Sequence, residues 1–313
     1  MNLGVEIGAG LRLKNPLLVA SGTFGYGVES AAFVDLASLG GIVTKGLYLT
    51  PRGGNEVPRI VETPSGLLNA IGLQGVGVHA FVRELLPRLS AHDTAILVNV
   101  CGDSVDEYAE VARVLGAVPG VAGLEINISC PNVKKGGLAF GSDPGMTHQV
   151  VRAVREATRL PVIPKLSPNV TDITVFARAC EEAGADALSC VNTVLALSVD
   201  VERRRPKLAF GTGGLSGPAI RPLAVRLAWQ AARAVKIPVI GIGGIASAED
   251  ALEFLIVGCR AFQVGTANFA DPGVHGKILA GLEDYLHRHR FTDINQVVGS
   301  LEYPGLPGRQ QPP

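Results

Sequence analysis

The sequence predicts an α/β fold of the (β/α)8 barrel class, on three observations. Eight short apolar segments alternate with amphipathic stretches along 313 residues, which suits a barrel of about 250 residues with insertions. Segments such as ILVNV and PVIGIG are apolar on both faces, as expected of parallel strands covered by helices. No GxGxxG motif opens the first helix, so a doubly wound sheet is the weaker alternative.

Each expected strand is short and is bounded by Gly, Pro or Asn. The eight strands are expected at residues 16–21, 41–45, 95–100, 123–129, 162–166, 187–191, 239–242 and 261–264. Three of the connecting segments carry helix signals, because each begins with Asp or a hydroxyl residue. These helices are expected within residues 103–117, 171–184 and 247–258, and the last two segments end in glycine. The pattern predicts eight βα units.

The remaining residues are expected to be additions to a single domain that spans residues 1–313, because no linker, repeat or low-complexity tract divides the chain. They form an N-terminal hairpin at residues 3–13 and insertions after the second, fourth and sixth strands. The insertions after the second and sixth strands are long, at about residues 48–74 and 194–217. Loops of this length in a compact domain usually carry function.

Composition excludes several classes of protein. Hydrophobic residues make up 47% and charged residues 18% of the chain, which excludes disorder. Equal numbers of basic and acidic residues, 28 of each, give no electrostatic case for binding nucleic acid or an anionic membrane. The apolar runs are too short for a transmembrane span, and residues 1–11 do not resemble a signal peptide. We therefore expect a cytoplasmic protein.

Cysteines and histidines give no sign of a metal site. Five cysteines are scattered without a CxxC pair, so a disulfide scaffold, a zinc site and an iron–sulfur cluster are not expected. Four of them are interpreted as core residues: Cys101, Cys180, Cys190 and Cys259. Six histidines without ligand spacing are interpreted as surface residues: His79, His92, His148, His275, His287 and His289.

Polar residues gather where the expected strands end, and the carboxyl ends of barrel strands are where catalysis takes place. Lys45 and Lys165 end two apolar strands. Because a buried lysine is costly without a negative partner, the pair indicates an anionic or electron-rich ligand; either one alone could be a snorkelling or ion-paired lysine. Asn99, Asn127 and Asn192 offer amides that donate and accept, which suits a planar heterocycle, although each alone could be a loop cap.

Two glycine-rich loops and one cysteine complete the candidate site. GIGGIAS and GTAN follow the seventh and eighth strands, where barrels commonly hold phosphate. Cys130 lies in ISCPN at the end of the fourth strand, before the glycine-rich loop VKKGGLAFG. That loop could move over a ligand, and its two lysines would favour the thiolate. The alternative is that Cys130 is a small core residue.

Eight motifs, taken together, resemble the dihydroorotate dehydrogenase family over about residues 3–290. They are NPLLVASGTFG, KG at 45–46, NAIGLQ, NISCPNVKKGG, KLSPN, VNT, GGLSG and GIGG. The resemblance implies a flavin mononucleotide (FMN) barrel that oxidises dihydroorotate to orotate in pyrimidine biosynthesis. It also implies Cys130 as the general base that removes the C5 proton while hydride leaves C6 for flavin N5.

The resemblance also assigns ligand contacts, residue by residue. The residues implied to bind FMN are Ser21, Lys45, Gly46, Asn99, Asn127, Lys165, Val191, Gly217, Gly243, Gly244, Gly265 and Thr266. The residues implied to bind the pyrimidine are Lys45, Asn69, Ala70, Ile71, Gly72, Leu73, Asn127, Asn132, Asn192 and Thr193. Lys165 would stabilise negative charge that grows on the flavin during reduction.

Two features indicate the class within the family. A cysteine rather than a serine base, and the lack of an N-terminal membrane helix, favour class 1 over class 2. NVKKGG and FGTGGLSGPAI resemble class 1B, which implies a homodimer joined to a subunit carrying FAD and a [2Fe–2S] cluster, with NAD⁺ as final acceptor. Some apolar surface should then be exposed for the partner. The alternatives are the fumarate-dependent class 1A and a related flavin-dependent dihydropyrimidine reductase.

Overall fold

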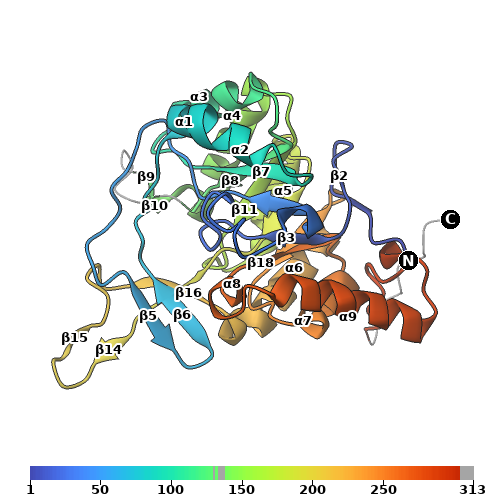
Figure 1. The fold of residues 1–313 in the computed structure, drawn as a ribbon. Helices are drawn as coiled ribbons and strands as arrows, with labels where there is room; N and C mark the ends of the chain where they lie inside the picture. The colour runs from blue at the N-terminus through green and yellow to red at the C-terminus, as the bar shows by residue number, and fades with distance from the viewer. Residues whose placement is uncertain (130, 133–137, 304–313) are drawn as a thin grey trace.

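The structure, a computed structural model, describes residues 1–129, 131–132 and 138–303. Eight parallel strands close into a barrel and follow one another around it in chain order, which confirms the predicted fold class (Figure 1). These strands are β3 (Leu17–Val19), β4 (Gly41–Val43), β7 (Ala95–Val100), β8 (Gly123–Asn127), β11 (Val162–Leu166), β12 (Leu188–Cys190), β17 (Val239–Ile242) and β18 (Ala261–Val264).

The observed bounds of the barrel strands are close to the predicted bounds, and the differences lie mainly at the carboxyl ends of four strands. The strands β7, β11, β17 and β18 have the predicted bounds, whereas β3, β4, β8 and β12 end one or two residues earlier than predicted. Lys45 illustrates the reason, because its backbone N–H donates to Gly25 O at 2.9 Å instead of continuing the β4 ladder. The chain leaves the sheet there, so polar residues expected at strand ends lie on the rim of the barrel.

The α-helices in the described part of the chain are α1 (Val78–Ala80), α2 (Leu86–Leu89), α3 (Val105–Gly116), α4 (Pro144–Ala157), α5 (Ile173–Glu182), α6 (Arg221–Ala234), α7 (Ala248–Ile256), α8 (Ala267–Ala270) and α9 (Val274–His289). A π-helical turn, Phe81–Leu85, joins α1 to α2. Four of the helices between the barrel strands, α3, α4, α5 and α7, begin at a residue whose side chain caps the first turn. Ser104 caps α3 and Ser247 caps α7, while Asp172 caps α5 in place of the expected Thr171.

The prediction of eight βα units was wrong in one place. Between β3 and β4 the structure has only a 3-10 turn, Leu36–Ser38, which Asp35 caps through a bond from Ala37 N. The preceding segment, GTFGYG, is rich in glycine, which disfavours an α-helix. The loop after β3 is therefore free to line the carboxyl end of the barrel.

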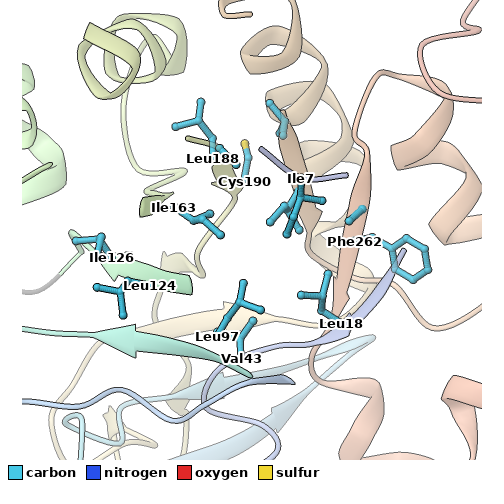
Figure 2. Close-up of a cluster of buried hydrophobic side chains, with 14 of the residues drawn as sticks. Ile7, Leu18, Val43, Leu97, Leu124, Ile126, Ile163, Leu188, Cys190 and Phe262 are labelled. Carbon is cyan, nitrogen blue, oxygen red and sulfur yellow. The ribbon is translucent and has the colours of Figure 1, made fainter. Parts of the chain in front are cut away.

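Apolar side chains fill the barrel towards its amino end, and the N-terminal hairpin closes that end. Figure 2 shows Ile7 among buried side chains such as Leu18, Leu124 and Phe262 of the barrel strands. Ile7 lies between β1 (Val5–Glu6) and β2 (Arg12–Leu13) and is fully buried. Gly8, next to it, has a φ of +102°, and a Cβ there would lie 2.2 Å from Asp186 O, just before β12. The hairpin therefore packs against the amino end of the barrel and leaves the carboxyl end for a site.

The two long insertions form one sheet. The segment between β4 and β7 holds β5 (Ile60–Thr63) and β6 (Gly66–Asn69), and the segment between β12 and β17 holds further strands. The latter are β13 (Val194–Ala196), β14 (Val199–Asp200), β15 (Arg205–Pro206) and β16 (Gly213–Ser216). β13, β16, β6 and β5 pair in that order, and Figure 1 shows this sheet and the β14–β15 hairpin extending to one side of the barrel.

A third, shorter insertion follows β8, where β9 (Pro131–Asn132) pairs antiparallel with β10 (Leu138–Ala139). Cys130 and residues 133–137 lie outside the described residues. Among the residues that the structure describes, no helix combines the length and the apolar character that crossing a bilayer requires. The extent of the single domain, residues 1–313, stays a prediction.

Most of the cysteine and histidine interpretations hold, with one exception. All four cysteines expected in the core are buried. His275, however, is only 2% exposed, so its interpretation as a surface residue was wrong. Its ring packs edge-on against Phe24, and Nε2 lies 2.8 Å from Asn268 Oδ1. Burial lowers the pKa of His275, because the charged form would lose its hydration.

Candidate active site

A cavity of about 900 Å³ lies at the carboxyl ends of the barrel strands. Every barrel strand contributes lining residues from its end or from the loop after it, and the insertion sheet contributes one wall. The predicted site residues that line this cavity are Ser21, Lys45, Gly46, Asn69, Ala70, Ile71, Gly72, Leu73, Asn99, Asn127, Lys165, Val191, Asn192, Thr193, Gly217, Gly243, Gly244, Gly265 and Thr266.

Two predicted residues cannot be placed against this cavity. Cys130 lies outside the described residues, and Asn132 belongs to β9, where only the backbone is described. Residues that lie as far apart in the sequence as Ser21 and Thr266 nevertheless share one cavity. The structure thus brings the other members of the predicted set together, while their individual ligand contacts stay predictions.

A buried carboxylate lies beneath the floor of the cavity. Glu125, in the middle of β8, is fully buried, and its Oε1 accepts from Asn99 Nδ2 at 2.8 Å and from Lys165 Nζ at 3.4 Å. Its Oε2 accepts from Gln263 Nε2 at 2.7 Å. Lys165 is itself 6% exposed, so this is a buried ion pair whose remaining lone pairs are used by amides. Lys165 therefore has the negative partner that its position requires.

The three strand-end asparagines are oriented by a continuous set of contacts. The Cys101 thiol lies 3.6 Å from Asn99 Oδ1, and Asn127 Nδ2 lies 3.6 Å from the same sulfur. Asn192 Nδ2 donates to Asn127 Oδ1 at 3.3 Å, and Asn192 Oδ1 accepts from Thr193 N at 2.8 Å. Because a primary amide has two donor protons and two acceptor lone pairs, each retains capacity for a ligand. Asn99, Asn127 and Asn192, here called the amide wall, thus present hydrogen-bond donors and acceptors in set orientations.

The opposite end of the cavity is built from backbone. Gly244 follows β17 with a φ of +76°, and a Cβ there would lie 2.9 Å from Gly217 O, so the two loops are in close contact. Thr266, after β18, donates through Oγ1 to Ser216 Oγ at 2.8 Å. The loops after β16, β17 and β18 therefore meet at this end, where glycines leave the backbone N–H groups without a covering side chain. Such loops suit the phosphate of a nucleotide.

Comparison with known proteins decides which family has this arrangement. A family model described as dihydroorotate dehydrogenase matches residues 3–286. The chain belongs to the dihydroorotate dehydrogenase family. Among similar proteins, those of Geotalea uraniireducens (strain Rf4) and Desulforudis audaxviator (strain MP104C) are 55% and 58% identical over 300 and 297 residues. These alignments cover 96% and 95% of this chain and 98% and 97% of the relatives.

The relatives agree on one type of dihydroorotate dehydrogenase. A third, from Geobacter sulfurreducens (strain ATCC 51573 / DSM 12127 / PCA), is 57% identical over 301 residues, which is 96% of this chain and 98% of the relative. All three are named dihydroorotate dehydrogenase B (NAD(+)), catalytic subunit. The family predicted from the motifs is therefore confirmed.

Sequence reasoning missed three polar residues of this dihydroorotate dehydrogenase barrel. Glu125 and Gln263 each interrupt an apolar strand, GLEIN and AFQV, and a carboxylate or an amide in such a strand is a signal of a buried polar contact that the sequence contains. Arg59 lies in the first long insertion, where no periodicity marks it.

Arg59 affects the site through the pKa of Lys45. Burial lowers this pKa, and the positive charge of Arg59 lowers it further, while the negative charge of Glu29 opposes the shift.

Proposed function

We propose that this chain is the catalytic subunit of a type B dihydroorotate dehydrogenase, which oxidises (S)-dihydroorotate to orotate in pyrimidine biosynthesis. The observation that carries the proposal is the cavity at the carboxyl end of the barrel, where Lys45, Lys165 and three asparagine amides converge. The relatives that align with nearly the full length of this chain are named for the same activity, which supports the proposal.

The cavity fits FMN by the chemistry of its donors. The loops at Gly217, Gly244 and Thr266 suit the phosphate, and Lys165 offers a buried cation to a flavin ring on which negative charge grows during reduction. When bound, FMN supplies a two-electron acceptor for the hydride that leaves C6 of dihydroorotate. The residues proposed to hold it are Ser21, Lys45, Gly46, Asn99, Asn127, Lys165, Val191, Gly217, Gly243, Gly244, Gly265 and Thr266.

The amide wall is proposed to hold the pyrimidine. Asn127 and Asn192 present amides whose orientation is set by Cys101 and Thr193, and dihydroorotate has alternating C=O and N–H groups to match them. Asn69 Nδ2 donates a hydrogen bond of 3.2 Å to Gly214 O, which fixes the orientation of this side chain between β6 and β16. Binding there would orient the substrate and exclude water.

Cys130 is proposed as the general base for the C5 proton. The resemblance to class 1 enzymes supports this role, with Asn132 on the carboxylate side of the substrate. Oxidation to orotate removes a hydride from C6 and a proton from C5, which accounts for both electrons and both protons. The proton needs an acceptor among the residues of this chain, and a thiolate is suited to that task.

The electrons are proposed to leave through a partner. The relatives' name, catalytic subunit with NAD(+), supports a separate subunit, for which we propose FAD and a [2Fe–2S] cluster on a cytoplasmic homodimer of this chain. Apolar side chains at least 56% exposed on the second long insertion support protein–protein contact there. They are Leu195, Leu197, Val201 and Phe210.

Anaerobic spectroscopy of the purified chain with FMN tests the proposal. We expect flavin absorbance near about 450 nm that dihydroorotate bleaches. Steady-state turnover should then reduce a dye but not NAD⁺, and addition of the partner should restore NAD⁺ reduction. A protein that binds no flavin, or one that bleaches with a nicotinamide and not with dihydroorotate, contradicts the proposal. Efficient fumarate reduction would place the chain in class 1A.

The lowered pKa of Lys45 predicts the pH dependence of orotate binding. Protonated Lys45 attracts the anionic ligand, so affinity should fall as pH rises through a pKa below the usual lysine value of about 10.4. Arg59→Met removes a cation that lowers this pKa, so the fall should begin at higher pH. Titrating orotate against flavin absorbance from about pH 7 to about pH 10 measures the shift. Arg59→Lys keeps the charge and should match the native protein; the same shift in both variants would contradict the electrostatic cause.

A further inference from the structure

We propose that Glu125 is a positioning residue whose buried carboxylate sets the electrostatic potential that Lys165 presents to the cavity. The inference rests on the proposed function, because the potential acts on a bound flavin and on orotate. Glu125 is not among the described residues that line the cavity, so it acts through its neighbours and not on a ligand. Nothing in the family match or in the relatives' names concerns it.

The geometry separates the two oxygens of the carboxylate by their partners. Oε1 accepts hydrogen bonds from Asn99 and Lys165, both of which line the cavity. Oε2 accepts a hydrogen bond from Gln263, whose amide also donates to Ser189 Oγ at 3.2 Å. Neither Gln263 nor Ser189 is among the described residues that line the cavity. One oxygen therefore holds the groups that face the ligand, and the other is anchored in the barrel below. The carboxylate fixes the floor of the cavity without reaching what binds there.

The charges explain why this position affects redox chemistry. The side chains of Lys165 and Glu125 are 7% and 1% exposed, so water screens neither charge. Because Glu125 offsets the lysine, the positive potential in the cavity is lower than a lone ammonium would produce. A lower potential disfavours the reduced state of a flavin, which carries more negative charge than the oxidised state. Glu125 thereby makes the bound flavin a stronger reductant, as transfer of its electrons towards NAD⁺, a weak oxidant, requires.

Glu125→Gln tests the inference and keeps the shape of the side chain. The introduced amide needs an acceptor, and Gln263 Oε1, which has no partner among the described residues, can supply one if the Gln263 amide turns over. We expect the midpoint potential of bound FMN to become more positive. We also expect the dissociation constant of orotate, an anion, to fall about tenfold, since one nearby negative charge has gone.

Ser189→Ala is the matched control. It removes a hydrogen bond at the edge of the same network without changing any charge. Stability should therefore change only by the contribution of that bond, while the midpoint potential should stay at the native value. A purely structural role for Glu125 would lower stability in both variants and leave the potential unchanged in both. Spectroelectrochemical titration of the FMN-loaded proteins distinguishes these results.

A double variant covers the case in which Glu125→Gln does not fold. Glu125→Gln combined with Gln263→Glu keeps one carboxylate in the network but moves it to the Oε2 side, away from the oxygen that meets Lys165. It should give a smaller shift of the potential in the same direction. If the folded variant that is measured binds FMN with the native potential, the inference is wrong although the proposed function stands. If the native chain binds no flavin, the proposed function itself is wrong.

Discussion

Replacing Cys130 with alanine is expected to slow anaerobic flavin reduction by dihydroorotate by about 10²–10⁴-fold, the usual contribution of a general base. FMN and orotate should still bind, because the groups proposed to bind them belong to other residues, all of which line the cavity except Asn132, whose side chain is not described. Stopped-flow absorbance of the FMN-loaded protein measures the reduction step. In the native protein the rate should rise with pH towards the pKa of the thiol, which is about 8.5 for a free cysteine.

Cys180→Ala provides the control for the loss of a thiol. Cys180 is buried in α5, and burial raises the pKa of its thiol well above the usual value, so it stays protonated and cannot act as a base. That variant should reduce flavin at the native rate. Cys130→Ser should fall between the native protein and Cys130→Ala or resemble Cys130→Ala, since an alcohol is a far weaker acid than a thiol. A native rate in Cys130→Ala would show that another residue removes the proton.

Replacing Lys165 with methionine is expected to have the second large effect. The change removes the cation and leaves the Glu125 carboxylate buried with only neutral donors, Asn99 and Gln263. Breaking a buried pair in this way typically lowers the free energy of unfolding by about 3–5 kcal/mol. FMN affinity should fall about 10- to 100-fold, because a charged donor to the ligand is lost. Denaturant unfolding and flavin titration measure the two effects separately.

A second substitution separates charge burial from ligand binding. Lys165→Met combined with Glu125→Gln removes both charges, so most of the lost stability should return while FMN affinity stays low. The difference between the double variant and the sum of the single variants measures the coupling of the pair. A loss of less than about 1 kcal/mol in Lys165→Met would be typical of an exposed ion pair and would contradict the buried network.

Local signals predicted much of the fold. ILVNV at β7 and PVIGIG at β17 are apolar on both faces, and these patterns predict the two parallel strands with their observed bounds. Ser247 forms a capping box with Asp250, which explains why α7 could be located from its first residues. The hydroxyl of Thr171 predicts a cap at that residue, but it is the side chain of Asp172 that accepts from Thr174 N and caps α5. Neighbouring residues with similar capping ability cannot be ranked without the backbone geometry.

Non-local contacts could not be predicted in the same way. Nothing in the sequence indicates that residues 66–69 pair with residues 213–216, because the alternation of each strand is short and its partner lies some 150 positions away. The lack of metal-ligand spacing predicts a surface position for His275, whereas Phe24, about 250 residues away in the sequence, packs against its buried ring. Packing of this kind depends on segments that meet only in the folded state.

The sequence by itself determined the barrel class, the order of its strands and the family, and its motifs predicted many of the residues that line the cavity. Each of these depends on short patterns, since the parallel strands of a barrel bring their carboxyl ends to one rim whatever lies between them. Only the tertiary structure decided that Glu125 neutralises Lys165, that Cys101 orients Asn99 and Asn127, and that the two insertions form one sheet. Most of these contacts join segments far apart in the sequence, and their strength depends on distance and burial, which a linear pattern does not contain.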